Sequence, residues 1–281
     1  MPWKPDVVLR EQSLPVTFRP QSKFSWKDVV SFVELSLTPY SKSIDTGTVR
    51  NNVMRKAYAI FASQPGRQYL FVLSIANQEL RAHMFNRSGV VHSRPYHIHR
   101  SPRVLLCMLG MLAFGNPEHI GCDPTLVYPS PRSSQLISPG TIQVGPMIYT
   151  IIRQLFFNFL LCGWGTSGWH VWRDGEDYVI KDSWTHASQV NREEDILNKI
   201  HGMKGVPQLV AAWTVEIAGS DDQTDTRRSS FPSLSRIRVH RRLAMQPVGV
   251  PLSDFKTICE LLSIIIDVLD SKSEQPHYLP T

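Results

Sequence analysis

Three glycines near the middle of the chain have the spacing found in loops that bind phosphate groups. Gly163, Gly165 and Gly168 complete a G-x-G-x-x-G pattern. Because glycine has no Cβ, such a loop can approach phosphate oxygens closely and donate backbone N–H groups to them. More than one class of nucleotide-binding protein uses this pattern, so the residues that follow it must decide between the classes.

The residues after the third glycine predict a β-hairpin. Residues 169–172 are rich in aromatic side chains and lead into Asp174-Gly175, a pair typical of hairpin turns. A dinucleotide-binding fold would instead begin a helix at the third glycine. The predicted returning strand, residues 178–181, ends in Lys181 and matches the V-A-I-K strand of protein kinases, whose lysine reaches the nucleotide phosphates.

The segment after this strand predicts a helix with an acidic start. Residues 192–200 carry two glutamates in their first turn and apolar residues at helical spacing behind them. In active kinases a glutamate on this helix pairs with the lysine of the strand. Glu193 is the first choice for an ion pair with Lys181, and Glu194 is the second.

Several longer strings make the resemblance specific to one family. The following resemble the fungal-type protein kinase family: Cys162-Gly163-x-Gly165-Thr166, Val179-x-Lys181-Asp182-Ser183-Trp184, and Arg241-Arg242-Leu243 with the Met245-x-Pro247-Val248-Gly249 that follows. Upstream, Phe85-x-Arg87-Ser88-Gly89 and Asp123-Pro124-Thr125 resemble the region that precedes the kinase domain in that family. The resemblance covers the chain from about residue 23 to about residue 269.

The resemblance implies a fold and a cofactor. The fold is α+β: an N-terminal α/β module, then a kinase-like small lobe of antiparallel strands with one helix, then a hinge and a hinge helix. The implied cofactor is ATP, with backbone groups near Met245 meeting the adenine. The implied binding residues are Gly163, Gly165, Gly168, Lys181, Glu193 and Met245.

The sequence also departs from the family pattern. A kinase needs an H-R-D-x-x-x-x-N catalytic loop and a D-F-G motif that holds magnesium, and residues 1–281 contain neither. His240-Arg241-Arg242 imitates the first motif but lacks its aspartate and falls in a strand-like segment before the hinge. We therefore expect no catalytic residues, no magnesium-binding motif and no phosphoryl transfer. The chain is interpreted as truncated before these loops, and a longer form would be a Ser/Thr-type phosphotransferase.

An alternative is that the hairpin persists as fold ancestry without a ligand. Trp164 and Trp169 are bulky residues near the glycines, which favours that alternative. Another alternative is a non-catalytic interaction or scaffold module. The apolar stripe of the predicted helix 257–269 is wider than one helix face, because Ile264, Ile266 and Val268 extend it. We therefore expect a protein partner or self-association there.

A third hypothesis concerns the N-terminal module. Asp28 and Glu34 on a strand, followed by a helix and two strands, weakly resemble the PD-(D/E)xK nuclease core. The lysine of that motif is replaced by Ser36, so any such activity would be lost. Strand carboxylates facing solvent are the simpler explanation.

Composition is consistent with a globular protein of two modules. The chain has 281 residues, 42% of them hydrophobic, and a formal net charge of +6, which suits phosphate ligands and a merely soluble surface equally. The four cysteines show no C-x-x-C spacing, so we expect thiols of a reducing compartment and no metal site. No signal peptide or membrane span is predicted, so the expected location is intracellular. Nucleic acid is not an expected partner.

The expected organisation has four parts. Residues 1–22 form an extended lead-in, 23–127 the α/β module, 128–141 a proline- and serine-rich linker, and 142–281 the kinase-like domain. Within the first module we expect a strand at 26–37, helices at 50–63 and 104–114, and strands at 69–75 and 80–86. The helix at 104–114 is expected to be buried, and residues 155–162 to be a core strand.

Overall fold

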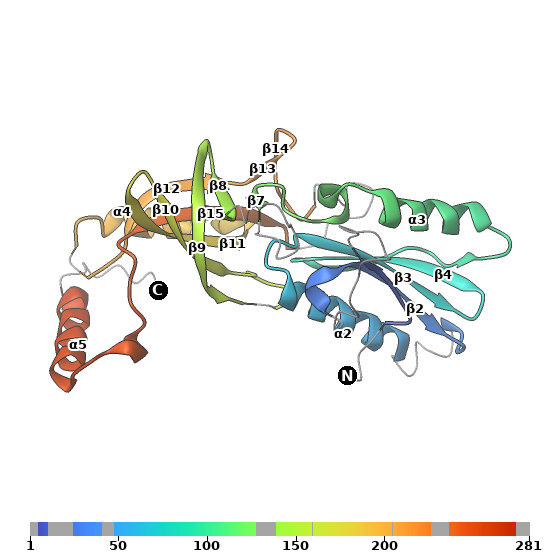
Figure 1. Ribbon diagram of the computed structural model, residues 1–281, viewed down its shortest axis with the longest axis horizontal. Coiled ribbons are helices and arrows are strands. Elements are labelled where there is room, and N and C mark those ends of the chain that lie inside the picture. Colours follow the sequence, from blue (N-terminus) through green and yellow to red (C-terminus); the bar gives the residue numbers. More distant parts are fainter. Residues whose placement is uncertain are drawn as a thin grey trace.

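The computed structural model describes residues 5–10, 25–40, 48–127, 139–158, 160–203, 205–225 and 236–273. Most of the expected lead-in and linker lies outside these residues. The described chain forms two large sheets that lie side by side along the long axis of the molecule, and a small two-stranded sheet (Figure 1). Among the described residues, no helix has the length and apolar character needed to cross a membrane.

The first sheet belongs to the N-terminal module. Its strands run in the order β1-β2-β3-β4-β5, with β6 also paired to β4. β2 and β3 are parallel and joined by a helix, while the other neighbours are antiparallel. The elements are β1 (Val7–Arg10), η2 (Trp26–Asp28), β2 (Val29–Ser36), α2 (Thr48–Ser63), β3 (Tyr69–Ala76), β4 (Glu79–Asn86), β5 (Gly89–His92), β6 (Tyr96–His97), α3 (Pro102–Phe114) and η3 (Pro117–Ile120).

The two long helices of this module cover opposite faces of the sheet (Figure 1). α2 buries Val53, Ala57 and Ile60 on one face, at helical spacing. The expectation of a buried α3 was wrong. Leu112 is buried against the other face, but Phe114 is 88% exposed. Only one side of α3 meets the sheet, and no described element covers its other side.

The second sheet has the strand order β12-β15-β11-β10-β9-β8-β7. Its strands are β7 (Leu126–Val127), β8 (Thr141–Val144), β9 (Met147–Phe157), β10 (Ser167–Arg173), β11 (Glu176–His186), β12 (Gln208–Thr214) and β15 (Arg238–Gln246). α4 (Arg192–Lys199), preceded by η4 (Ala187–Gln189), packs on this sheet, and β13 (Glu216–Ile217) pairs with β14 (Ser220–Asp221). Because β7 joins this sheet, the sheet begins before the expected linker.

The predicted hairpin is present as β10 and β11. Asp174 and Gly175 both have positive φ, 51° and 92°, as a tight hairpin turn requires. Ile180 lies opposite Trp169 and Ala244, and these side chains are buried on one face of the sheet. Lys181, the next residue, therefore points to the other face.

Two further segments differ from expectation or extend it. The apolar run 155–162 is not one core strand, because β9 ends at Phe157 and Leu160 is exposed in the loop that follows. After η6 (Leu252–Asp254), α5 (Ile258–Ser273) stands apart from both sheets (Figure 1). Its start agrees with the predicted helix 257–269 and it continues past the predicted end.

Candidate functional site

Lys181 forms the predicted ion pair with Glu193. β11 and α4 place Lys181 Nζ 2.5 Å from Glu193 Oε1, with both side chains partly exposed. Leu197 on the same helix packs against Leu243 and Met245 of β15, which holds α4 on the sheet. The second choice, Glu194, instead pairs with Arg241, with Oε2 2.5 Å from Nη2.

Met245 lies near the end of β15, where the hinge was expected. It is the cross-strand neighbour of Val179 on β11, and its side chain is buried under α4. The next residue, Gln246, donates from Nε2 to Glu176 Oε2 at 3.0 Å, which ties the end of β15 to the β10–β11 hairpin. Met245 is thus a packing residue whose backbone borders the candidate site.

Gly168 is the glycine closest to Lys181. The two residues are direct partners in the β10–β11 register. A Cβ at position 168 would lie 2.2 Å from Cε1 of Phe156, whose half-exposed ring crosses the glycine from β9. Close packing of Phe156 therefore requires glycine here.

The other two glycines contact the N-terminal module. Gly163 N–H donates to the carbonyl of Arg87 at 2.9 Å, and Arg87 Nη1 donates to the carbonyl of Leu160 at 2.6 Å. A Cβ on Gly165, which has φ +49°, would lie 2.6 Å from Arg87 Nε. The structure thus places Arg87 against the glycine loop at the junction of the two modules.

The two tryptophans near the glycines have different positions. Trp164 is half-exposed in the loop and accepts a backbone hydrogen bond from Trp184 at 2.7 Å. Trp169 is fully buried in the core of the second sheet. Only Trp164 is therefore a bulky loop residue of the kind that the ligand-free alternative invoked.

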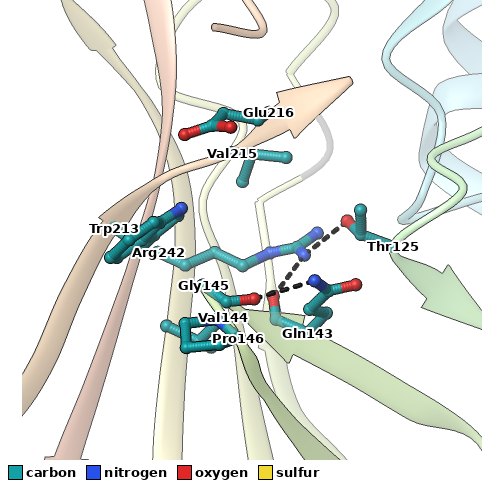
Figure 2. A pocket seen from close by; sticks show the side chains of 9 residues that line it. All are labelled: Thr125, Gln143, Val144, Gly145, Pro146, Trp213, Val215, Glu216 and Arg242. Atoms are coloured by element: carbon teal, nitrogen blue, oxygen red, sulfur yellow. Dashed lines mark hydrogen bonds between the residues drawn. The ribbon is translucent and has the colours of Figure 1, made fainter. Parts of the chain in front are cut away.

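A buried network of charges lies on the sheet face opposite Lys181. Its centre is Arg242 on β15, which is fully buried. Arg242 Nη2 lies 2.5 Å from Asp123 Oδ2, and its Nε lies 3.1 Å from Asp182 Oδ1. Its Nη1 donates to Thr125 Oγ1 at 2.7 Å and to the carbonyl of Gln143 at 2.8 Å (Figure 2).

His240 extends the network by two residues along β15. Its Nε2 lies 2.6 Å from Asp182 Oδ1 and its Nδ1 lies 2.9 Å from Asp222 Oδ2, with the ring stacked on Trp184 at 4.5 Å. Burial alone would lower the pKa of His240, but the two carboxylates outweigh it and raise this pKa to about 9. The ring is therefore an imidazolium that donates both hydrogen bonds.

Asp182 carries the complementary charge. Burial acts to raise the pKa of this carboxyl, but Arg242 and His240 hold it well below its usual range. Arg242, His240 and Asp182 thus stay charged in the interior because each neutralises its neighbours.

Asp123, Asp182 and His240 are close enough together to suggest a metal site, with one candidate ligand atom each within 4.8 Å of the others. Their hydrogen bonding does not fit a metal ion. Asp182 Oδ1 already accepts from Arg242 and His240, and an imidazolium has no free lone pair. Arg242 and His240 neutralise these carboxylates, as a bound metal ion would otherwise do.

Asp123, Thr125, Asp182 and Arg242 belong to the strings that resemble the fungal-type family, but these strings do not reveal a buried network. The interpretation of residues 240–242 as part of a strand is correct. Alternation along β15 sends His240 and Arg242 into the network and Arg241 to Glu194. His240 and Arg242 are basic residues two apart on one predicted strand, and Asp182 directly follows the predicted strand 178–181. This pattern was the signal that could have revealed a buried network.

The carboxylates of the nuclease hypothesis are not brought together. Glu34 on β2 forms a buried ion pair with Lys56 of α2. Asp28 lies in η2, before the strand begins, and six residues of extended chain span about 20 Å. This arrangement does not support a nuclease site.

Comparison with known proteins identifies the family. No curated protein matches the sequence. A sequence model described as fungal protein kinase matches residues 4–237, which is most of the chain and includes Lys181 and Glu193. β15, with His240 and Arg242, lies beyond the matched residues. The extent of the match shows that the chain belongs to the fungal protein kinase family.

Proposed function

We propose that this protein binds the phosphates of ATP weakly through Lys181 and does not itself transfer the phosphoryl group. The observation that carries this proposal is the assembled Lys181–Glu193 ion pair, with Nζ and Oε1 2.5 Å apart. Kinases require this pair in place for activity. Glu193 holds the flexible lysine so that its charge is directed at one position, which lowers the ordering cost of binding an anion.

The glycine loop supports weak binding more than strong binding. Its Gly163 N–H is already committed to the carbonyl of Arg87, so this group is not available to a phosphate oxygen. The carbonyl of Trp164 accepts a hydrogen bond from the N–H of Trp184. Trp184 lies three residues past Lys181 on β11, about 10 Å along the strand, so the loop is held away from the lysine. Lys181 therefore supplies the main attraction for a phosphate.

Replacement of Lys181 tests the nucleotide site. We expect Lys181→Met to abolish saturable ADP and ATP binding in isothermal titration calorimetry. The partly exposed ion pair contributes at most about 1 kcal/mol to stability, so thermal unfolding should change little. Lys199→Met removes the same charge from an exposed position on α4 and should leave binding intact. Absence of binding by the unmodified protein, or equal losses in both variants, would contradict the proposal.

Phosphoryl transfer is expected to be absent. Residues 1–281 contain no catalytic aspartate in an H-R-D context and no D-F-G carboxylate to position magnesium. Incubation with radiolabelled ATP, magnesium and a generic basic protein should give incorporation no higher than that of Lys181→Met. Incorporation clearly above that control would show that other residues perform the chemistry.

A second candidate function, a protein-interaction module, is favoured by α5. Ile258 is 73% exposed and Leu269 is 60% exposed, with Leu262, Ile265 and Ile266 also exposed on the same helix. Burying one such side chain contributes about 1.5–3 kcal/mol. A contiguous exposed apolar surface of this kind usually marks an interface.

Self-association through α5 can be measured by sedimentation. We expect the unmodified protein to form dimers or larger species at micromolar concentration. The triple variant Ile258→Ser, Leu262→Gln, Ile266→Lys should shift it to monomer. Leu37→Gln, which removes a 97% exposed leucine from the N-terminal module, is the control and should not change the distribution. A stable monomer before any substitution would remove the reason for assigning an interface to α5.

A further inference from the structure

A pocket of about 300 Å³ lies on the face of the second sheet opposite Lys181. Its lining comes from the β8–β9 turn, residues 144–146, and from Trp213 and Glu216, and the side chain of Arg242 runs between the turn and Glu216 (Figure 2). Pockets that hold small ligands have about this volume or more. It is separate from the proposed nucleotide site, because Arg242 and Lys181 point to opposite faces of the sheet.

Trp213 gives the pocket a rigid aromatic wall. The indole lies against Gly145, where a Cβ would be 2.8 Å from Trp213 Cδ2. Gln143 Nε2 donates to the carbonyl of Gly145 at 2.8 Å and holds this turn. The side chain of Trp213 is nevertheless 42% exposed, and within the described part of the chain its indole N–H has no hydrogen-bond partner.

The charges around the pocket favour a cation. Glu216 is an exposed carboxylate on the pocket wall, and no described residue forms an ion pair with it. Arg242 cannot offer its charge to an anion, because Asp123 and Asp182 already neutralise it. Glu216 and the three network carboxylates, Asp123, Asp182 and Asp222, carry −4 against +2 from Arg242 and the His240 imidazolium, which leaves a local charge of −2 in a chain whose net charge is +6.

We propose that this pocket binds an organic cation, a guanidinium or alkylammonium group, between the Trp213 indole and the Glu216 carboxylate. An indole attracts such a cation through its π-system. Glu216 adds the opposite charge, and the pocket volume admits one such group. The cation is either a free small molecule or the side chain of an arginine or lysine in a peptide. This site does not depend on nucleotide binding elsewhere in the protein.

The indole N–H resonance of Trp213 provides the test. We label the tryptophans with ¹⁵N, assign the Trp213 signal with Trp213→Phe, and titrate with N-acetyl-arginine amide. A saturable shift is expected. N-acetyl-citrulline amide has nearly the same shape without the charge, and should bind about tenfold more weakly or not at all.

Charge substitution completes the test. Glu216→Gln should weaken arginine amide binding several-fold, whereas Glu118→Gln, which removes an exposed carboxylate from the N-terminal module, should not. Equal binding of citrulline, a shift that never saturates, or identical affinity in Glu216→Gln would overturn the proposal. Tighter binding of an Ac-Gly-Arg-Gly amide than of the free arginine amide would identify a peptide as the source, and equal binding a small molecule.

Discussion

Substitution of Arg242 with alanine is expected to lower the free energy of unfolding by about 3–5 kcal/mol. Arg242 is fully buried, and it pairs with both Asp123 and Asp182. Its removal leaves two interior carboxylates that have lost a cation, together with Thr125 Oγ1 and the Gln143 carbonyl without their donor. Urea denaturation followed by circular dichroism measures the change.

Two comparison variants show whether the loss comes from uncompensated charge. Arg153→Ala removes an exposed arginine of β9 and should change stability by less than about 0.5 kcal/mol. The triple variant Arg242→Met, Asp123→Asn, Asp182→Asn removes the carboxylate charges together with the guanidinium. It should be more stable than Arg242→Ala alone. If Arg242→Ala costs no more than Arg153→Ala, the buried network does not stabilise the fold.

Stability should fall as pH rises from about 6.5 to about 9 because of His240. The pKa of His240 is raised to about 9 in the folded protein, against 6.5 for an ordinary histidine. The folded state therefore keeps a proton that the unfolded state releases in this window. The contribution of protonated His240 to stability is fully present below pH 6.5 and is lost above pH 9. The pKa difference between the folded and unfolded states corresponds to about 3 kcal/mol.

The comparison with His240→Gln isolates this effect. The variant cannot titrate at this position. The difference in the free energy of unfolding between the wild type and the variant should therefore shrink across the same pH window. His83 acts in the opposite direction, since burial, His92 and Arg81 lower its pKa to about 3. It should reduce stability as pH falls below 6.5, which places the optimum near neutral pH. A wild-type advantage over His240→Gln that stays constant from pH 6 to 9.5 would show that His240 is not protonated in the folded state.

The part of the candidate site that the sequence predicted is local. Asp174-Gly175 fixes the β10–β11 hairpin, and alternation along β11 then separates Lys181 from the core residue Ile180. Glu193 stands in the first turn of the next helix, so a short connection is enough to bring it to Lys181. Local periodicity and turn chemistry determine such features because few chain contacts are needed to specify them.

The glycine pattern was informative about fold but not about environment. Its spacing identified the hairpin loop, yet Gly165 contacts Arg87 and Gly168 contacts Phe156. A glycine permits close approach of any group. Whether that group is a phosphate or a guanidinium depends on a residue from another module, which the local sequence does not contain.

The local sequence is enough to predict the hairpin and the Lys181–Glu193 pair. The buried network of Asp123, Asp182, Asp222, His240 and Arg242 becomes visible only in the folded chain. These residues come from distant segments, and each taken alone would be expected at the surface, because burying a single charge is costly. Their burial is possible because the second sheet curls: β7 and β15 are five positions apart in the strand order, yet Arg242 of β15 contacts both Gln143 of β8 and Asp123, just before β7. That pairing depends on the three-dimensional packing of the strands, which no local pattern encodes.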